Sequence, residues 1–301
     1  MTAIYGVIGH PVGHSLSPDM FNTAFYEYNE DARYEAFDVA PEKLKDFIGT
    51  NVKTGGAGND SSGMVPAGEA DEPGVAFCGP ILGLSVTIPH KETIIPLLNE
   101  VDDVAMEIGA VNTVERKISG RAGAQKIRLK GHNTDWIGAQ KALEEVTSLE
   151  GKRVLVIGAG GAAAAIVYAC RKAGAAVTVL NRKEDKAKQL ADKFNCGYGV
   201  IDEILRHPAD VLVHTTSVGM SPNTGVSLVP PEYFKRGMVI MDIVYNPLET
   251  KLVKEARAAG CRIVPGYKML LYQAEKQFEL WFKKKAPILK MEKALLEGLN
   301  K

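Results

Sequence analysis

Cysteine is scarce in this chain, and no long run of apolar residues occurs. The four cysteines, at positions 78, 170, 196 and 261, form no CxxC pair and have no histidines at zinc-site spacing, so no bound metal is expected. Without a stretch of about 18 apolar residues, no membrane-spanning helix is expected either. The first residues lack the basic-then-apolar order of a signal peptide. These absences predict a protein of the reducing cytoplasm with no membrane partner.

Neither sign of charge is in excess. The chain has 301 residues, with 36 Lys and Arg against 36 Asp and Glu. Non-specific affinity for nucleic acid depends on a surplus of Lys and Arg, so a nucleic-acid partner is not expected. A content of 46% hydrophobic and 24% charged residues is typical of a globular protein, and the length predicts about two domains.

Short apolar runs alternate with helical patterns in the first half of the chain, which predicts a parallel or mixed sheet covered by helices. Between them, residues 54–79 are rich in Gly, Ser, Asp, Glu and Pro without periodicity, which predicts a tolerated surface insertion. The expected strands are 4–9, 34–39, a segment from 83, and 110–114, and the expected helices are 18–28 after an N-cap at Ser17, 41–48, and 91 to about 101.

The second half has a sharper pattern. Residues 153–157 form a continuous apolar run, followed by a Gly-rich turn and a helix of small residues, as in parallel strands buried on both faces. Further strands are predicted at 176–180, 211–214 and 239–243, and helices over 267–300 except near Pro287. We therefore expect three segments: an α/β domain at 1–135, a doubly wound Rossmann-type domain at 151–265, and C-terminal helices at 266–301.

The Gly-rich turn fits a dinucleotide site. Gly158 suits the tight turn, Gly160 allows the backbone to approach a pyrophosphate, and Ala163 is a permitted small third residue. The phosphates would lie at the helix N-terminus, where free N–H groups favour an anion. The alternative is a strand–helix turn of the same composition without any ligand.

The end of the second strand of this domain indicates which nucleotide binds. Asn181 stands where NAD-binding proteins carry an acidic residue, and Arg182 follows it, with Lys186 one helical turn further on. A neutral residue followed by basic ones suits the 2′-phosphate of NADP. Glu184 is close enough to serve a ribose 2′-hydroxyl, so NAD remains the alternative cofactor.

Three polar stretches of the first half contain more detail than packing requires, although each could be a helix cap or a charged first turn. Together with the Gly-rich turn and three later segments they resemble the shikimate dehydrogenase family. The segments are, in chain order, HSLSP at 14–18, SVTIPHK at 85–91, GAVNT at 109–113, GHNTD at 131–135, GAGGA at 158–162, TTSVGM at 215–220, DIVYNP at 242–247 and GYKMLLYQA at 266–274. The resemblance covers nearly the whole chain except residues 54–79 and the last dozen.

This resemblance implies reversible, NADPH-dependent reduction of 3-dehydroshikimate to shikimate, in the pathway that leads to chorismate and the aromatic amino acids. The substrate domain would be 1–135, the NADP domain 151–265, and 266–301 would return toward the substrate domain. The catalytic pair would be Lys91 and Asp135, which supply a cation or proton to the developing alkoxide and orient that cation. Ser15 and Ser17 would hold the substrate carboxylate. The other implied substrate contacts are Thr87, Asn112, Asp135, Tyr245 and Gln273, and the implied cofactor contacts are Gly158, Ala159, Gly160, Gly161, Ala162, Asn181, Arg182, Lys186, Thr215, Ser217, Met220, Gly266 and Met269.

Some features leave the substrate open. Ser85 stands where many bacterial members carry Asn, and a serine there resembles plant-type and some quinate-using relatives, so a quinate or quinate/shikimate dehydrogenase using NAD is the nearest alternative. A non-catalytic shikimate-binding regulator is a remote alternative, against which the intact Lys91 and Asp135 speak. His214 is expected to be structural. The active site is expected in a cleft between the domains, which the chain crosses near residues 135–151 and again near Gly266. Monomer and homodimer both remain open.

Overall fold

The computed structural model describes residues 2–53, 81–120 and 126–300, which form two compact units. The first unit contains residues 1–134 and 274–301, and the second contains residues 135–273. The predicted insertion at 54–79 lies outside the described residues. The chain passes from the second unit back to the first between residues 273 and 274, inside one long helix, α9 (Gly266–Phe282).

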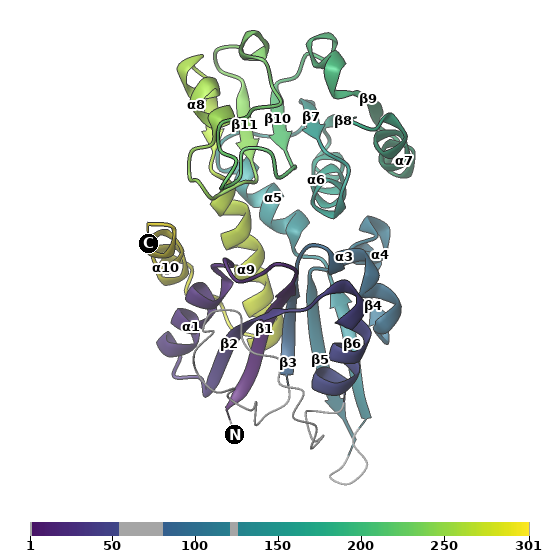
Figure 1. The fold of residues 1–301 in the computed structure, drawn as a ribbon, viewed down its shortest axis with the longest axis vertical. Helices are drawn as coiled ribbons and strands as arrows, with labels where there is room; N and C mark the ends of the chain where they lie inside the picture. The colour runs from purple at the N-terminus through teal and green to yellow at the C-terminus, as the bar shows by residue number, and fades with distance from the viewer. Residues whose placement is uncertain (1, 54–80, 121–125, 301) are drawn as a thin grey trace. The chain divides into compact units, whose positions relative to one another are not determined.

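The first unit contains a mixed sheet of six strands in the order β2-β1-β3-β5-β6-β4 (Figure 1). β1 pairs in parallel with both β2 and β3, whereas β3 with β5 and β5 with β6 are antiparallel, and β4 is parallel to β6. This confirms the mixed α/β class predicted from the sequence. The strands are β1 (Ala3–Gly9), β2 (Ala32–Asp38), β3 (Ile81–Val86), β4 (Glu100–Val101), β5 (Thr113–Ser119) and β6 (Lys126–His132).

Aromatic side chains fill one face of this sheet. α1 (Ser17–Glu27) packs against α10 (Ile288–Leu299), and Phe21 of α1 stacks on Tyr34 of β2 with ring centroids 4.4 Å apart. Trp281 near the end of α9 lies 5.3 Å from Phe21, and its indole N–H donates to the carbonyl of Val114 at 3.2 Å. Large apolar rings supply much of the burial energy of a core, so these contacts fix the C-terminal helices to the N-terminal sheet within this unit.

Short helices connect the strands of the first unit. Two of the predicted elements are wrong here, because the expected helix over 91–101 is divided and the expected strand over 110–114 begins only at Thr113. Pro96 lacks an N–H and its ring would clash with the carbonyl four residues earlier, so the α-helix ends at Thr93. The short helices are 3₁₀ Pro41–Lys43, α2 (Leu44–Phe47), π Ile48–Lys53, α3 (His90–Thr93), 3₁₀ Ile95–Leu97 and α4 (Asp103–Ile108).

The second unit is built on a fully parallel sheet in the order β12-β11-β10-β7-β8-β9 (Figure 1). Numbered from β7, this is the 6-5-4-1-2-3 order of a doubly wound dinucleotide-binding domain, which confirms the predicted class. The strands are β7 (Arg153–Ile157), β8 (Ala176–Asn181), β9 (Gly197–Val200), β10 (Val211–His214), β11 (Val239–Asp242) and β12 (Arg262–Val264). The helices are α5 (Asp135–Glu144), α6 (Gly161–Lys172), α7 (Glu184–Phe194), 3₁₀ Ile201–Arg206, 3₁₀ Pro231–Tyr233 and α8 (Lys251–Ala258).

The carboxyl ends of the central strands lie at one edge of this sheet. Ile157 of β7 is in register with both Leu180 of β8 and His214 of β10, and His214 is in register with Asp242 of β11. The strand order reverses between β7 and β10, and ligands of open α/β sheets bind at such a switch point. The loops after these four strands therefore come together where a nucleotide is expected.

Candidate active site

The turn after β7 requires glycine at its first position. Gly158 has a φ of +117°, and a Cβ there would lie 2.3 Å from the hydroxyl of Thr215. That hydroxyl donates to the carbonyl of Ile157 at 2.7 Å. Any larger side chain at Gly158 would have both a strained backbone and a steric clash, so the loop after β10 is held directly against the turn.

The next glycine faces open space. A Cβ at Gly160 would meet no protein atom within 4 Å. Gly160 is also the N-cap of α6, and it offers no side chain to the free N–H groups of the first turn. Ala163, one turn into the helix, is fully buried. The residues present therefore fit a pyrophosphate, because the approach to the helix N-terminus is clear and the positive end of the helix dipole is uncapped.

The residues predicted to choose between NADP and NAD lie at the end of β8 and the start of α7. Asn181 is the last residue of the strand, and its side-chain amide donates to the carbonyl of Lys183 at 3.0 Å. Arg182 and Lys186 are exposed, and within the described part of the chain neither has an ion-pair partner. Glu184 is the exposed first residue of α7. Residues 182–186 carry three cations and two carboxylates, and this excess of positive charge favours a phosphate at this position.

A buried network joins the loops that follow β10 and β11. His214 Nδ1 lies 2.9 Å from Asp242 Oδ1, and His214 Nε2 lies 2.5 Å from Thr216 Oγ1. Asp242 also accepts from the Thr250 hydroxyl at 2.7 Å and from the Val244 N–H at 3.1 Å. Both members of the pair are about 1% exposed. His214 is therefore structural, as predicted, and it ties the loop of Thr215 and Ser217 to the loop of Tyr245.

The remaining predicted cofactor residues lie near these loops or on α9. Ser217 and Met220 are exposed in the turn after β10, where the Met220 N–H donates to the Ser217 carbonyl at 3.2 Å. Gly266 begins α9, and a Cβ there would lie 2.2 Å from the carbonyl oxygen of Asp242. Met269 follows one turn later and is buried. Gly266 is thus required for the close approach of α9 to the end of β11.

Asp135 and Gln273 belong to helices that touch within the second unit. Asp135 is the first residue of α5 and is 4% exposed. A Cβ at Gly138, one turn further on, would lie 2.6 Å from the carbonyl of Met269 and 2.9 Å from the N–H of Gln273. Gln273 is also buried and donates to the Leu270 carbonyl at 3.0 Å. The small residue in α5 therefore brings these two predicted substrate contacts onto neighbouring helix faces.

The serine pair of the first unit lies beside a buried tyrosine. Ser17 is 5% exposed and is the first residue of α1, where it makes no N-cap hydrogen bond, so its predicted capping role is wrong. Its N–H donates to the Ser15 hydroxyl at 3.3 Å. Burial raises the pKa of Tyr34, and hydrogen bonds with Ser85 and Ser17 offset this in part. The Ser17 hydroxyl therefore belongs to a polar cluster inside an aromatic core.

Gln277 is a polar residue of this cluster that the sequence analysis missed. The Tyr34 hydroxyl donates to Ser85 Oγ at 2.6 Å, and Ser85 Oγ donates to Gln277 Oε1 at 2.8 Å. The Gln277 amide donates in turn to the Asn112 carbonyl at 3.0 Å and to the Thr113 hydroxyl at 2.9 Å. The available signal was its spacing, since Gln277 lies four residues after Gln273 and therefore on the same face of α9.

Hydrogen bonds gather three predicted segments at one edge of the sheet. The Val111 N–H donates to the Lys91 carbonyl at 2.7 Å. Asn112 is 2% exposed, its Oδ1 accepts from the Thr134 N–H at 2.7 Å, and its Nδ2 donates to Thr134 Oγ1 at 2.9 Å. Thr134 directly precedes Asp135. Thr87 lies just beyond β3 on the same path, where its N–H donates to the Ile8 carbonyl at 2.9 Å.

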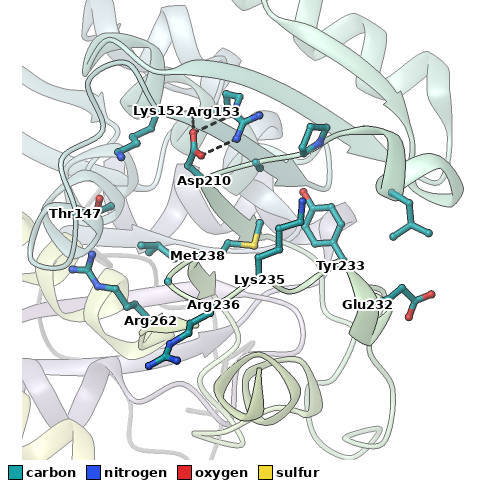
Figure 2. Close-up of a pocket in the computed structure, with 15 residues that line it drawn as sticks. Thr147, Lys152, Arg153, Asp210, Glu232, Tyr233, Lys235, Arg236, Met238 and Arg262 are labelled. Carbon is teal, nitrogen blue, oxygen red and sulfur yellow. Dashed lines mark hydrogen bonds and ion pairs between the residues drawn. The ribbon is translucent and has the colours of Figure 1, made fainter. Parts of the chain in front are cut away.

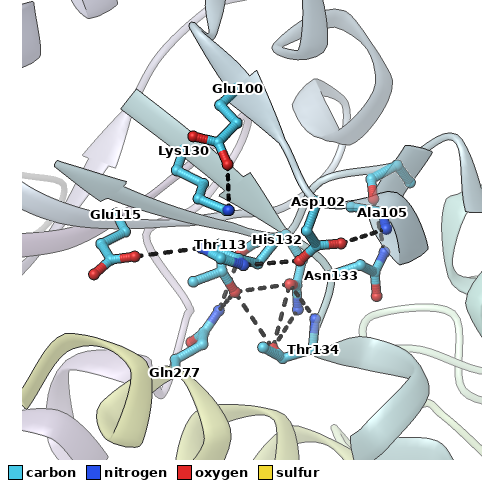
Figure 3. A network of polar contacts seen from close by, with 12 residues as sticks. Glu100, Asp102, Ala105, Thr113, Glu115, Lys130, His132, Asn133, Thr134 and Gln277 are labelled. Carbon is cyan, nitrogen blue, oxygen red and sulfur yellow. Dashed lines mark hydrogen bonds and ion pairs between the residues drawn. The ribbon is translucent and has the colours of Figure 1, made fainter. Parts of the chain in front are cut away.

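A charged network adjoins these segments on β5 and β6 (Figure 3). His132 Nδ1 lies 2.7 Å from Asp102, and His132 Nε2 lies 3.4 Å from Glu115. Burial alone would lower the pKa of His132, but hydrogen bonds with Asp102 and Glu115 outweigh it and raise the pKa. Hydrogen bonding from His132, followed by that from Lys283, lowers the pKa of Glu115 to about 2. This cluster holds the β5–β6 pair that carries Asn112 and Thr134 at its ends.

Among the described residues, no group of three or more His, Cys, Asp or Glu could hold a metal ion. Within residues 2–53, 81–120 and 126–300, no helix is long and apolar enough to cross a membrane.

The fold and the site define a two-unit oxidoreductase with a dinucleotide-binding domain, and family comparisons agree. Three family descriptions match the chain: "Shikimate dehydrogenase substrate binding domain" at residues 7–60 and 75–114, "Shikimate / quinate 5-dehydrogenase" at 139–243, and "Shikimate 5'-dehydrogenase C-terminal domain" at 266–296. The chain belongs to the shikimate dehydrogenase family. The matches include parts of residues 54–79 and of the last dozen residues, so the similarity extends further than the motifs indicated.

Individual relatives match over the full length. A shikimate dehydrogenase (NADP(+)) from Methanobrevibacter smithii is 41% identical, covering 99% of this chain and 98% of the relative. A crystal structure of a shikimate dehydrogenase in complex with NADP+ has a TM-score of 0.84 at 35% identity, covering 100% of this chain and 96% of that one. The shikimate 5-dehydrogenase from Thermus thermophilus in complex with NADP(H) and shikimate has a TM-score of 0.81 at 32% identity, covering 99% of this chain and 100% of that one.

Proposed function

We propose that this chain catalyses the reversible reduction of 3-dehydroshikimate to shikimate with NADPH. The observation that carries the proposal is the set of hydrogen bonds that gathers the Lys91, Asn112 and Thr134 segments at one edge of the first unit's sheet. Each segment contains one of the family's polar motifs, and the fold brings them together although 43 residues separate Lys91 from Thr134. Full-length similarity to shikimate dehydrogenases supports the same assignment.

Lys91 and Asp135 are the proposed catalytic pair. Bound NADPH supplies the hydride to the ketone carbon, and the ketone oxygen then develops negative charge. The Lys91 ammonium donates a hydrogen bond and then a proton to this oxygen, and in the reverse direction the Lys91 amine takes the proton of the alcohol. The Asp135 carboxylate orients Lys91 and accepts a hydrogen bond from the neighbouring hydroxyl. Opposite charges on the two groups reduce the cost of removing each from water.

Ser15 and Ser17 are the proposed donors to the substrate carboxylate. Their hydroxyls lie at the start of α1, where the N-terminal N–H groups add to the attraction for an anion. Ser17 is buried against Tyr34, so its hydroxyl has a fixed position. Thr87, Asn112, Tyr245 and Gln273 complete the proposed contacts with the ring hydroxyls and the carboxylate.

NADP is proposed as the preferred cofactor. The pyrophosphate would lie at the start of α6, against Gly158, Ala159, Gly160, Gly161 and Ala162. The 2′-phosphate would be held by Asn181, Arg182 and Lys186. The support for this choice is the unpaired charge on Arg182 and Lys186 among the described residues. The proposed contacts with the nicotinamide half of the cofactor are Thr215, Ser217, Met220, Gly266 and Met269.

Quinate with NAD is the second candidate, and Ser85 is the residue that raises it. The Ser85 hydroxyl accepts from Tyr34 and donates its one hydrogen to Gln277, so it has no donor left for a substrate. Any effect of Ser85 as a donor to the substrate would then be exerted through the positions of those two side chains. Initial rates with shikimate and with quinate, each with NADP+ and with NAD+, separate the two functions. Shikimate with NADP+ should have the highest kcat/KM, and a higher value for quinate with NAD+ would contradict the proposal.

Lys91→Ala tests the catalytic pair itself. The variant should lower kcat by about 100-fold or more, the range found when a positioned acid–base group is lost. The Kd of NADP+ should stay within about twofold, because the Gly-rich turn belongs to the other unit. Lys45→Ala is the matched control, since Lys45 is an exposed lysine of the first unit on α2. A near-normal kcat in Lys91→Ala would show that the proposed mechanism is wrong.

A further inference from the structure

The second unit has a pocket at the edge of its sheet opposite the Gly-rich turn. Its volume is about 510 Å³, and it is formed where the strands begin (Figure 2). Arg153 and Arg262 are the first residues of β7 and β12, and Asp210 directly precedes β10. The Gly-rich turn follows the last residue of β7, so five strand residues, or about 16 Å, separate it from the pocket.

Positive charge is concentrated in this pocket although the whole chain is neutral. Its lining includes five cationic residues and two carboxylates, which leaves a formal excess of three positive charges (5 − 2) against a net charge of +0 for the chain. The cations are Lys152, Arg153, Lys235, Arg236 and Arg262, and the carboxylates are Asp210 and Glu232.

Asp210 forms an ion pair with Arg153. Its carboxylate accepts from the Arg153 N–H at 3.0 Å, from Nε at 3.2 Å and from Nη2 at 2.9 Å. These hydrogen bonds from Arg153 lower the pKa of Asp210 to about 2, with a smaller contribution from the charge of Lys152, so the carboxylate is ionised. Within the described part of the chain, Lys152, Lys235, Arg236 and Arg262 have no ion-pair partner. Among the described residues, four cations around this pocket thus have no ion pair, and of the four only Lys152 feels the charge of Asp210.

Backbone hydrogen bonds fix the main chain from which two of these cationic side chains extend. The Arg262 N–H donates to the Met238 carbonyl at 2.8 Å, and the Gly237 N–H donates to the Gly260 carbonyl at 3.0 Å. Gly260 has a φ of +80°, and a Cβ there would lie 3.2 Å from Arg236 Cγ. The turn that carries Arg236 is therefore hydrogen-bonded to the strand that carries Arg262, and Arg236 lies over a position that has no side chain. Figure 2 shows Lys152, Thr147 and Arg262 grouped on one side of the pocket.

We propose that this pocket binds a small organic phosphate at a site separate from the cofactor. Arginine forks match phosphate oxygens two at a time, and a phosphate carries up to two negative charges for an excess of three positive ones. The Thr147 hydroxyl adds a neutral donor, and the buried side chains of Tyr233 and Met238 give an apolar wall for the organic part of the ligand. Like charges held together repel each other, and a bound phosphate removes that cost.

Calorimetric titration with inorganic pyrophosphate tests the site on the full chain. Saturating NADP+ is present throughout, so that the phosphate positions of the cofactor site are filled, and ionic strength is held constant because phosphate binding is salt-dependent. One pyrophosphate should bind per chain. The double variant Arg236→Ala/Arg262→Ala should weaken binding at least about tenfold, which corresponds to about 1.4 kcal/mol.

Two controls make the result specific. Arg171→Ala/Arg257→Ala removes the same charge from exposed helical arginines outside the pocket, and it should leave the Kd of pyrophosphate within about twofold. Citrate, a carboxylate trianion, should bind at least about tenfold more weakly than pyrophosphate. The absence of saturable pyrophosphate binding, an equal loss in the control variant, or equal affinity for citrate would each overturn the proposal. Unchanged thermal unfolding of both double variants would show that they remain folded.

Discussion

Glu115→Gln should lower the stability of the chain by removing one charge from the network on β5 and β6 (Figure 3). The Glu115 carboxylate lies 3.4 Å from His132 Nε2 and accepts from Lys283 Nζ at 3.2 Å. Its side chain is 15% exposed and that of His132 is 13% exposed. Glutamine keeps the shape of the side chain and removes the charge, so the change isolates the electrostatic contribution.

The size of the effect follows from the pKa. The pKa of Glu115 is lowered from 4.5 to about 2 by hydrogen bonding with His132 and Lys283, and one pKa unit corresponds to about 1.4 kcal/mol. This sets an upper bound of about 3 kcal/mol. The Lys283 side chain is 68% exposed, so solvent screens part of the attraction, and we expect a loss of about 1–2 kcal/mol in the free energy of unfolding.

The sign of the pH dependence follows from the direction of each shift. The pKa of Glu115 is depressed, so its stabilisation is fully present above its unfolded pKa of 4.5 and is lost as the pH falls toward about 2. The pKa of His132 is raised above 6.5, so its stabilisation is fully present below 6.5 and is lost as the pH rises through the folded value. The difference between wild type and Glu115→Gln should therefore be largest at about pH 5–6.

Urea unfolding monitored by circular dichroism at several pH values measures this difference. Glu107→Gln is the matched control, because Glu107 is an exposed residue of α4 with no ion pair among the described residues. It should change the free energy of unfolding by less than about 0.5 kcal/mol. A Glu115→Gln effect that is equal at about pH 3.5 and pH 5.5, or no larger than that of the control, would refute this electrostatic reasoning.

Three further predictions concern the second unit and residues 55–73. Arg182→Ala should raise the KM for NADP+ by about tenfold and leave NAD+ kinetics nearly unchanged, because Arg182 is proposed to bind the 2′-phosphate, which NAD+ lacks. A wild-type preference for NAD+ would contradict this prediction and direct attention to Glu184. His214→Leu should lower the free energy of unfolding by about 2–4 kcal/mol in urea unfolding, because it leaves the buried Asp242 carboxylate one donor short; a loss below about 0.5 kcal/mol would be inconsistent with the network. Replacing residues 55–73 by a short Gly-Ser linker should keep kcat and substrate KM within about threefold in steady-state assays, a change under about 1 kcal/mol. A collapse of kcat in the folded variant would show that this segment is part of the working enzyme.

The sequence was most informative about the second unit, where local pattern and tertiary environment agree. The apolar run at residues 153–157 is a strand buried on both faces, and Gly158 has the positive φ that its place in the turn requires. Short edge strands were not predicted, because β9 and β12 have four and three residues and the pattern in so short a window does not distinguish a strand from a loop.

In the first unit, tertiary contacts overrode local pattern. The helical spacing after Lys91 continues past Pro96, but the chain there forms a 3₁₀ turn and then β4, which gains its hydrogen bonds from β6. Likewise Ser17 is a residue type that favours the N-cap position, yet it is buried beside Tyr34 and Ser85. Gln277 of α9, near the other end of the chain, belongs to the same cluster.

The sequence by itself predicted the class of the protein and the Gly-rich turn, because both depend on residue types at short, fixed spacing. The proposed catalytic pair, Lys91 and Asp135, came from the resemblance to a known family. Only the tertiary structure decided how the polar residues are satisfied. Gln277 bonds to Ser85, Asn112 and Thr113, over sequence separations of up to 192 residues. The cationic pocket likewise draws its lining from residues between 147 and 262. Hydrogen bonds and charge clusters of this kind depend on distances that the folded chain sets, and no local pattern in the sequence encodes those distances.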